Sequence, residues 1–526
     1  MIYARTICAA LVLACLLAFA GGAALAQSEP DQVQLILSRP QSKASFRNSL
    51  PRGAYEAIKR RAGQANVHVL PMSRTEIWSV PRANATAVRS EAVRYGATVE
   101  LMAATSGPAF KTASANVDMS ERQRLAFEQA KTSLAAVGIK AMTVPPPAMI
   151  EYAMTKGASG TAPPSKMAIE LKENEVVTIT GKSVDKRDNL YVFRGSVDGT
   201  EAPATLMWWG DGKMVGTVQH AGHIYMFRHM GGTVYASVEM SMERMPQEHA
   251  PMSARMRSAD PGLRDDPLVQ QGEAGALRKV TTGMRAPAPP RTGAERRAPT
   301  KGAAVGGEIV IDVMVAYTKK TAANYGDIKR ELVDLAIEEG NEAFRNSGLG
   351  HIKLRLVHAY QTGYAEEGEH FDHVWRLADK GDGYMEEVHP LRDRHKADVA
   401  ILIVDDPKGC GLATRVYADA DEAFAVVHHD CAALTYSLAH EIGHIIGARH
   451  EPNIDKSTTP FPYGHGYVNG TKWRDIMSYR ESCGGCARVP VWSSPKVLIR
   501  GEPAGTPEQD NARVIAEQAA RVAAFR

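Results

Sequence analysis

The segment that decides the fold reads His440-Glu441-Ile442-Gly443-His444-Ile445-Ile446-Gly447-Ala448-Arg449-His450. On a helix, His440 and His444 lie one turn apart on one face, so both imidazoles can bind a single metal ion. Glu441 points beside that ion, which suits a base that takes a proton from a zinc-bound water. Gly447 can adopt the left-handed conformation that ends a helix, and the turn brings His450 to the ion from another direction. Three protein ligands and one open position indicate a catalytic rather than a structural zinc site.

A second motif, Asp475-Ile476-Met477-Ser478-Tyr479, follows the histidine segment along the chain. Together the two motifs resemble the signature of the metzincin zinc peptidases, in which a Met-turn places a methionine as an apolar floor beneath the metal ligands. The resemblance assigns that role to Met477. It also places Tyr479 where astacin-like and serralysin-like enzymes carry a tyrosine that stabilises the oxyanion. A tyrosine that only packs is the alternative interpretation of Tyr479.

Further segments of residues 307–526 resemble the bacterial peptidyl-Asp metalloendopeptidases, which are metzincins related to the reprolysin-like group. The segments that carry this resemblance are Ile309–Thr318, Leu391–Val404, Cys410–Leu412, Ala423–Val427, Pro460–Tyr467, Trp492–Pro495 and Asp510–Arg513. The resemblance implies an α/β metzincin catalytic domain, with a twisted mixed sheet, an active-site helix and a Met-turn.

The same resemblance implies cleavage before Asp, and that preference needs a cationic pocket for the residue after the scissile bond (P1′). Arg474, Arg480 and Arg488 lie near the Met-turn and could form the arginine–carboxylate contact. Each arginine taken alone is more simply explained as a solvated surface residue, so the sequence singles out none of them.

Composition bounds the class of protein. A chain of 526 residues is long enough for more than one domain, and 44% hydrophobic and 23% charged residues are ordinary for a soluble globular protein. A net charge of +3, without a basic block interleaved with aromatic residues, gives no indication of nucleic-acid binding. After the first 26 residues no apolar stretch reaches the roughly 18 residues of a membrane span. We therefore expect a soluble monomer that acts on protein or peptide substrates.

Residues 1–26 have the features of a secretory signal peptide. Arg5 supplies the positive charge, residues 6–20 are almost entirely apolar, and Ala24-Leu25-Ala26 forms an A-x-A cleavage site. We therefore expect an exported protein, with secretion favoured and the periplasm as the alternative compartment.

Two of the six cysteines lie in the predicted signal, and the others are Cys410, Cys431, Cys483 and Cys486. An even number of cysteines in an exported protein predicts two disulfides, with three connectivities open. We favour Cys410–Cys431 and Cys483–Cys486. A redox or metal-binding role for the Cys483-Gly-Gly-Cys486 motif is the alternative.

Residues 27–245 are predicted to be an α+β pro-region without a metal-binding motif. Between about 168 and 242, apolar and polar residues alternate as in antiparallel strands, and this β-rich part resembles the propeptides of reprolysin-like enzymes. Residues 120–136 have helical periodicity. Residues 246–306, rich in Pro, Arg, Ala and Gly, are predicted to be a linker that suits proteolytic removal.

The way in which this pro-region silences the enzyme is open. Residues 27–409 contain no cysteine, so a propeptide cysteine bound to zinc is excluded. A carboxylate, a histidine or simple occlusion of the cleft must serve instead.

Residues 307–526 are predicted to alternate strands and helices. The predicted strands are Ile309–Tyr317, Ile352–Val357, Val399–Val404 and Ala423–Val427, the last as an edge strand beside the substrate cleft. The predicted helices are Ala322–Asn346, part of Met385–His395, Ala432–Ile446 and a short one from about Asn511.

Four polar residues outside the motifs have two interpretations each. His428 and His429 could line the cleft, but packing or surface roles are favoured. His465 is expected to form hydrogen bonds in a loop. Asp510 is expected to cap a helix rather than to bind calcium, and nothing in the sequence supports a calcium requirement.

These observations favour a secreted zinc-dependent metalloendopeptidase that is made as a zymogen. A peptide would dock along the edge strand, and Glu441 would be the general base. One alternative is a secreted protein whose residues 27–250 bind a partner, with the zinc domain secondary; the presence of Glu441 argues against it. Another is a thiol–disulfide protein built on Cys483 and Cys486, which would be insensitive to zinc chelators.

Overall fold

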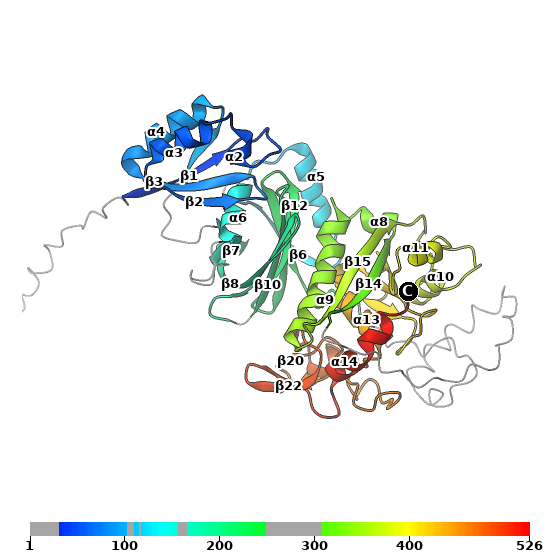
Figure 1. Cartoon of the computed structure of the whole chain (residues 1–526). Coiled ribbons are helices and arrows are strands. Elements are labelled where there is room, and N and C mark those ends of the chain that lie inside the picture. Colours follow the sequence, from blue (N-terminus) through cyan, green and yellow to red (C-terminus); the bar gives the residue numbers. More distant parts are fainter. Residues whose placement is uncertain (1–30, 103–109, 115–116, 156–165, 201, 249–306) are drawn as a thin grey trace, which may run out of the picture. The chain divides into compact units, whose positions relative to one another are not determined.

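The computed structural model describes residues 31–102, 110–114, 117–155, 166–200, 202–248 and 307–526 (Figure 1). The predicted signal peptide and residues 249–306 of the predicted linker lie outside these ranges. The chain divides into two compact units, Met1–Ser106 and Gly107–Arg526, which are described separately. In the described part of the chain, no helix has both the length and the apolar character that a membrane span needs.

The first unit is a four-stranded antiparallel sheet with helices packed on it. Its strands lie in the order β2-β3-β1-β4, and they are β1 (Gln32–Ser38), β2 (Asn66–Leu70), β3 (Thr75–Pro81) and β4 (Thr98–Met102). The short α2 (Phe46–Ser49) and α3 (Ala54–Ala62) connect β1 to β2, and α4 (Arg82–Arg94) connects β3 to β4. This is the β-α-β-β-α-β order of a split βαβ fold, and Phe46, Ile58 and Trp78 lie in its core.

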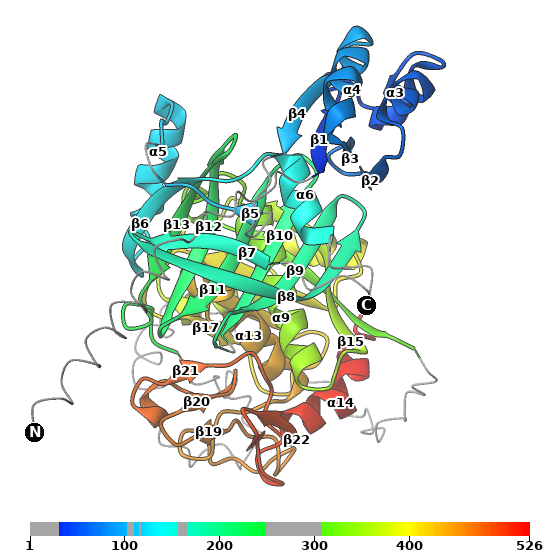
Figure 2. The ribbon, with the colours of Figure 1, turned by 90° about the vertical axis from the view of Figure 1, so that its left-hand side faces the viewer.

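The second unit begins with a nine-stranded sheet in the order β5-β7-β8-β9-β10-β11-β12-β13-β6. The strands are β5 (Phe110–Lys111), β6 (Ala136–Thr143), β7 (Lys166–Lys172), β8 (Glu175–Arg187), β9 (Leu190–Val197), β10 (Pro203–Trp209), β11 (Met214–His220), β12 (His223–Gly231) and β13 (Val234–Met240). Ala113, just beyond β5, forms an antiparallel bridge with Thr143 of β6, so the two edges meet and the sheet curls into a barrel (Figure 2). We call residues 110–248 the barrel region.

The barrel region confirms the antiparallel strands predicted from the alternating pattern. Two helices accompany the strands, α5 (Glu121–Ala130) and α6 (Pro147–Thr155). The prediction of a helix over 120–136 was too long. The helix ends at Ala130 because the Thr132 hydroxyl donates to the Gln129 carbonyl at 2.7 Å and the chain then turns into β6.

Residues 309–526 are built around a five-stranded sheet in the order β15-β14-β16-β18-β17. The strands β14 (Ile309–Tyr317), β15 (Ile352–Gln361), β16 (Val399–Val404) and β18 (Phe424–His428) are parallel, and β17 (Gly411–Ala413) is antiparallel to β18. Apolar residues cover both faces of the sheet, as parallel strands require. Ile311, Val313 and Val315 face α9 (Leu335–Asn346) and α13 (Ser437–Ile446), and Met314 and Ala316 face α10 (His370–Ala378) and α11 (Val388–Arg394).

The structure corrects the predicted edge strand. The predicted strand Ala423–Val427 corresponds to β18, which lies between β16 and β17 and is buried throughout. The edge is β17, a strand of three residues that is too short to produce a periodic pattern.

Two predicted helices are also interrupted. The prediction of one helix over Ala322–Asn346 fails because α8 (Lys319–Ala322) ends before a turn at Asn324-Tyr325-Gly326-Asp327; a π-helical turn, Lys329–Asp334, then leads into α9. The predicted helix Ala432–Ile446 is divided into α12 (His429–Ala432) and α13 by Tyr436, whose φ of 59° is left-handed.

The rest of the chain, after α13, is mostly loop, as predicted. It forms two small sheets, one of β19 (Val468–Asn469), β20 (Trp473–Arg474) and β21 (Ala487–Arg488), and one of β22 (Ser494–Ile499) and β23 (Glu502–Ala504). The predicted terminal helix is α14 (Asn511–Val522), and the Asp510 side chain caps it by accepting from the Arg513 N–H.

Candidate active site

Helix α13 and the turn that follows it bring the three predicted ligands together. Nε2 of His450 lies 3.2 Å from Nε2 of His440 and 3.0 Å from Nε2 of His444. Gly447 makes the turn with a φ of +134°, and a Cβ at this residue would come within 2.8 Å of the Phe461 ring. Both the conformation and the space at this position therefore require glycine.

Hydrogen bonds of two of the rings, those of His440 and His444, leave the lone pair on Nε2. Nδ1–H of His440 donates to the Ile476 carbonyl and Nδ1–H of His444 to the Ala448 carbonyl, each at 2.9 Å. Burial lowers the pKa of His440 to about 3 and that of the other two rings well below the usual 6.5, so all three are neutral. Nδ1 of His450 is buried without a partner among the described residues, so the Nε2 of that ring is free to act as a ligand as well. Tetrahedral bonds of about 2.0–2.1 Å would set donor atoms about 3.4 Å apart, close to the observed separations. The donor set therefore fits a metal ion.

Glu441 lies beside these rings and against the edge strand. Its side chain is almost fully buried, and Oε2 has no hydrogen-bond partner among the described residues. Burial, reinforced by the charge of Glu248, raises the pKa of this carboxyl well above its usual range. A Cβ added to Gly411 on β17 would lie 2.4 Å from Oε1 of Glu441, so the carboxylate rests directly on the backbone of the edge strand.

The residues of the second motif lie under and beside the histidines. Met477 is fully buried, and its Sδ would lie 3.2 Å from a Cβ at Gly443 of α13. The Tyr479 ring lies 4.5 Å from the His450 ring, and its hydroxyl is buried without a partner among the described residues. Burial and, next, Glu248 raise the pKa of Tyr479 well above 10, so the hydroxyl keeps its proton and can donate it.

Sequence reasoning missed two carboxylates that hold this turn. Glu451 accepts hydrogen bonds from the Tyr479 N–H and the Ser482 hydroxyl. Asp475 accepts from the Ser478 hydroxyl at 2.6 Å and the Ser493 N–H at 3.1 Å. The sequence signal that could have identified Glu451 was its place directly after His450, and for Asp475 it was the first position of the second motif.

Two of the three candidate arginines are buried, contrary to the surface interpretation. The side chains of Arg474 and Arg488 are 2% exposed, whereas that of Arg480 is 29% exposed. Carbonyl oxygens hold both buried guanidinium groups: Arg474 Nε donates to Ser478 at 3.0 Å, and Arg488 Nη1 donates to Thr435 at 2.7 Å.

The cysteines pair as favoured, Cys410 with Cys431 and Cys483 with Cys486. The first disulfide ties the residue before β17 to α12, and the second closes the loop that leads into β21. His465, as expected, forms a loop hydrogen bond, from Nδ1 to the His450 carbonyl at 2.8 Å.

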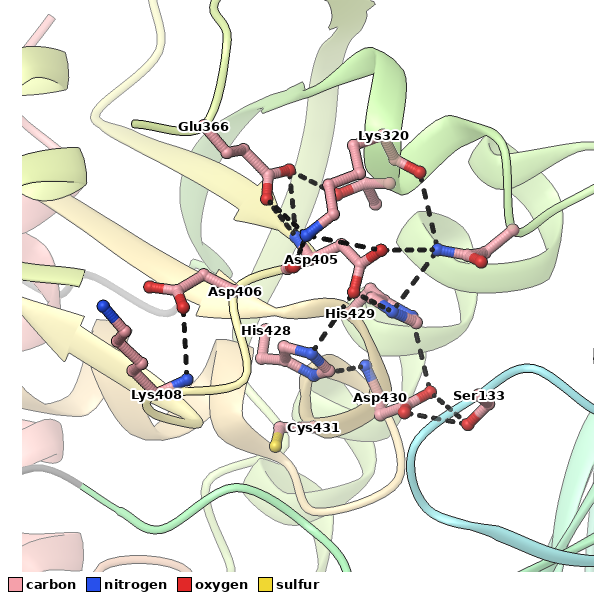
Figure 3. Close-up of polar contacts among 12 residues, drawn as sticks. Ser133, Lys320, Glu366, Asp405, Asp406, Lys408, His428, His429, Asp430 and Cys431 are labelled. Carbon is pink, nitrogen blue, oxygen red and sulfur yellow. Dashed lines mark hydrogen bonds and ion pairs between the residues drawn. The ribbon is translucent and has the colours of Figure 1, made fainter. Parts of the chain in front are cut away.

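His428 and His429 form a second cluster with Asp405 at the end of β18 (Figure 3). Both histidines are buried, in agreement with the packing role. Nε2 of His429 lies 3.4 Å and Nε2 of His428 3.8 Å from Oδ1 of Asp405. However, Nδ1 of His428 accepts the backbone N–H of Asp430 at 3.1 Å, so the neutral ring carries its proton on Nε2. That proton occupies the position at which a metal would bind.

Known metallopeptidases match the part of the chain that contains this site. The model of the reprolysin-like metallopeptidases of family M12 matches residues 308–489. A peptidyl-Asp metalloendopeptidase from Xanthomonas campestris pv. campestris is 33% identical over 70% of this chain and 84% of the relative. One from Pseudomonas fragi is 43% identical over 36% of this chain and 100% of the relative. A solved metalloproteinase-II from Bacteroides fragilis is 14% identical over 56% of this chain and 85% of that chain, at a TM-score of 0.31. The chain therefore belongs to the peptidyl-Asp metalloendopeptidase family and is a metalloendopeptidase.

Proposed function

We propose that this chain is a secreted, zinc-dependent endopeptidase that is made as a zymogen and prefers an acidic residue at P1′. The domains would be a signal peptide at 1–26, a pro-region at 27–245, a linker at 246–306 and a metzincin catalytic domain at 307–526. The observation that carries the proposal is the convergence of three histidine Nε2 atoms next to a buried carboxyl group with an unpartnered oxygen.

Zinc would be held by His440, His444 and His450, whose neutral imidazoles suit this ion. When bound, it supplies Lewis acidity that polarises a peptide carbonyl and makes water more acidic. We propose that Glu441 takes the proton of the attacking water and later passes it to the leaving amine. Burial raises the pKa of Glu441, which strengthens this carboxylate as a proton acceptor.

The neighbouring elements supply orientation. A peptide would pair with the free edge of β17, which lies against Glu441. The Tyr479 hydroxyl, protonated and without a partner among the described residues, would donate to the oxyanion. The buried guanidinium groups of Arg474 and Arg488 would bind the P1′ carboxylate.

The zymogen part of the proposal is supported by contacts between the barrel region and the α/β sheet domain. Arg194 of β9 is paired with Glu338 of α9, both buried, and Lys213 pairs with Asp327 at 2.6 Å. Apolar residues of both parts share one core, with Met226 and Met240 of the barrel among them. Such an interface keeps the barrel region beside the active site until the linker is cut.

The test is digestion of a denatured protein mixture by the purified enzyme, with every cleavage site determined. We expect enrichment of Asp at P1′, loss of cleavage with a zinc chelator, and its recovery when zinc is added back. The Glu441→Gln enzyme should bind zinc but not cleave. Hydrolysis that survives chelation or this substitution would refute the mechanism, and cleavage without acidic enrichment would refute the specificity alone.

A further inference from the structure

The chain that leaves the barrel runs along the candidate active site. After β13, the Met242 carbonyl accepts a hydrogen bond from Arg480 Nη1 at 2.5 Å. Five residues later, the Gln247 carbonyl accepts the backbone N–H of Cys410 at 2.8 Å, directly before the edge strand β17. We call residues 241–248 the exit segment. Its main chain thus lies next to the residue that precedes β17, the strand with which a substrate would pair.

The exit segment ends, within the described residues, at a carboxylate that binds both buried arginines. Oε1 of Glu248 forms a short ion pair with Arg488 Nη2 and lies 3.9 Å from Arg474 Nη2. The Glu248 side chain is 14% exposed. Charge-assisted hydrogen bonds between buried groups are strong and directional.

No other carboxylate of the described residues is within ion-pair distance of these two arginines. Nε of Arg488 is buried without an acceptor in the same part of the chain, so a donor remains for a second carboxylate oxygen. Removing one partner of such a buried group leaves the other uncompensated. Once the exit segment departs, these two desolvated cations lack a counter-ion, and an incoming carboxylate can supply it.

Glu248 does not act as a metal ligand in this arrangement. Among the described residues, the side chains whose donor atoms converge at this site are the three histidines, and Glu248 is not one of them. Its effect on the catalytic residues is through charge, since it raises the pKa of both Glu441 and Tyr479. The Glu248 carboxylate is therefore the counter-ion of Arg474 and Arg488.

We propose that Glu248 is an internal surrogate for the substrate's acidic side chain, held by the Arg488–Arg474 pair that reads the P1′ carboxylate in the processed enzyme. This inference rests on the proposed function and deepens it. It names the residues that determine specificity, and it answers how a pro-region without cysteine silences the site. The exit segment competes with substrate through the same charge that the enzyme selects.

Three synthetic peptides of residues 241–248 test the proposal as inhibitors of the processed enzyme. They are the natural sequence, the E248Q peptide and, as a matched control, the E243Q peptide, because Glu243 is an exposed carboxylate of the same segment. We expect equal inhibition constants for the natural and E243Q peptides and an inhibition constant about ten-fold higher for the E248Q peptide. Equal inhibition by all three peptides would overturn the proposal.

The arginine is tested on the same three peptides. On Arg488→Gln enzyme the inhibition constants should agree within about two-fold, whereas Arg480→Gln enzyme should keep the natural ten-fold difference. A difference that persists without Arg488 would assign Glu248 to another site and overturn the proposal. Thermal melting establishes that each enzyme is folded, and Arg474→Gln replaces Arg488→Gln if the latter is not.

A binding measurement separates this inference from the proposed function. Fluorescently labelled forms of the same peptides are titrated with processed Glu441→Gln enzyme, which has lost the exit segment and cannot hydrolyse. We expect the ten-fold preference for the natural peptide here too. If that preference is present but the wild-type enzyme hydrolyses nothing, the proposed function fails alone. If hydrolysis is normal and the preference is absent, the surrogate fails alone.

Discussion

Two buried histidine clusters lie at neighbouring places in the α/β domain and differ in what they can bind. His440 and His444 donate Nδ1–H to carbonyls and direct Nε2 lone pairs at one point. His428 accepts a backbone N–H at Nδ1 and so presents a proton from Nε2. Both clusters satisfy a simple distance criterion for a metal site. The backbone group at Nδ1 decides whether Nε2 carries a lone pair or a proton, and so whether the histidine can be a ligand. The spacing of residues in a sequence does not show which backbone group this is.

The clusters also differ in their surrounding charge. Arginines border the first, and carboxylates border the second, where Asp430 receives a hydrogen bond from Ser133 of the barrel region at 2.8 Å (Figure 3). The first arrangement suits chemistry on an anionic substrate. The second joins the barrel region to the α/β domain.

The largest expected effect is the loss of activity when the first cluster is broken. His450→Ala should lower kcat/KM by at least about 10³-fold, because metal and base act together. It should also reduce the zinc content from one ion per chain to none. His428→Gln should retain one zinc ion and most of the activity. Two zinc ions in the wild-type chain, with one lost in His428→Gln, would show that the second cluster also binds metal.

The next largest effect is expected on substrate specificity, when an arginine beside the first cluster is replaced. Arg488→Gln should lower the ratio of kcat/KM for an Asp peptide to that for its Asn analogue by about a hundred-fold, mainly through the Asp peptide. Arg480→Gln, a change of the same kind at an arginine that does not contact Glu248, should leave the ratio within about two-fold. An unchanged ratio in the Arg488→Gln enzyme would contradict the proposal that the arginines beside the first cluster select an acidic substrate.

The second cluster should instead be visible in the pH dependence of stability. Burial and then the neighbouring His429 lower the pKa of His428 to about 3, so the folded protein keeps this ring neutral where the unfolded chain protonates it. The unfolded state then binds more protons between pH 6.5 and 3. The contribution of this ring to stability is complete above pH 6.5 and falls by about 1.4 kcal/mol per pH unit below it. His428→Gln should flatten this part of a plot of unfolding free energy against pH, and an unaltered slope would contradict the assignment.

The smallest effect is at the contact with the barrel region. Ser133→Ala removes the hydroxyl that donates to Asp430 and should destabilise the full-length chain by about 1 kcal/mol, measured by denaturant unfolding. Thr132→Ala, at the neighbouring exposed hydroxyl, should have a smaller effect. Equal effects would mean that the second cluster does not anchor the barrel.

Sequence reasoning worked where chemistry or periodicity acts over a short range. The histidine segment predicts the arrangement of its own side chains. Helical spacing places His440 and His444 on one face, and the turn at Gly447 places His450 beside them. The strands β14 and β16 were predicted with their observed bounds, since both are continuous apolar runs.

The failures came from pairings between distant segments. The three residues of β17 become an edge strand only by pairing with β18, and the closed barrel depends on Ala113 meeting Thr143. Arg488 looks like a surface residue until carbonyls from Thr435 and Ser478 enclose it. Glu248 has no motif around it, and only the folded chain brings it to the arginines.

Gly411 illustrates how little space surrounds the Glu441 carboxyl group. The backbone there is compatible with any residue, since its φ is not positive, yet even one methyl group would occupy the place of a carboxylate oxygen of Glu441. A Gly411→Ala protein should therefore fold but hydrolyse peptides poorly. A substitution at position 411 should thus lower the rate of hydrolysis, whereas a measurement of unfolding stability should show little change.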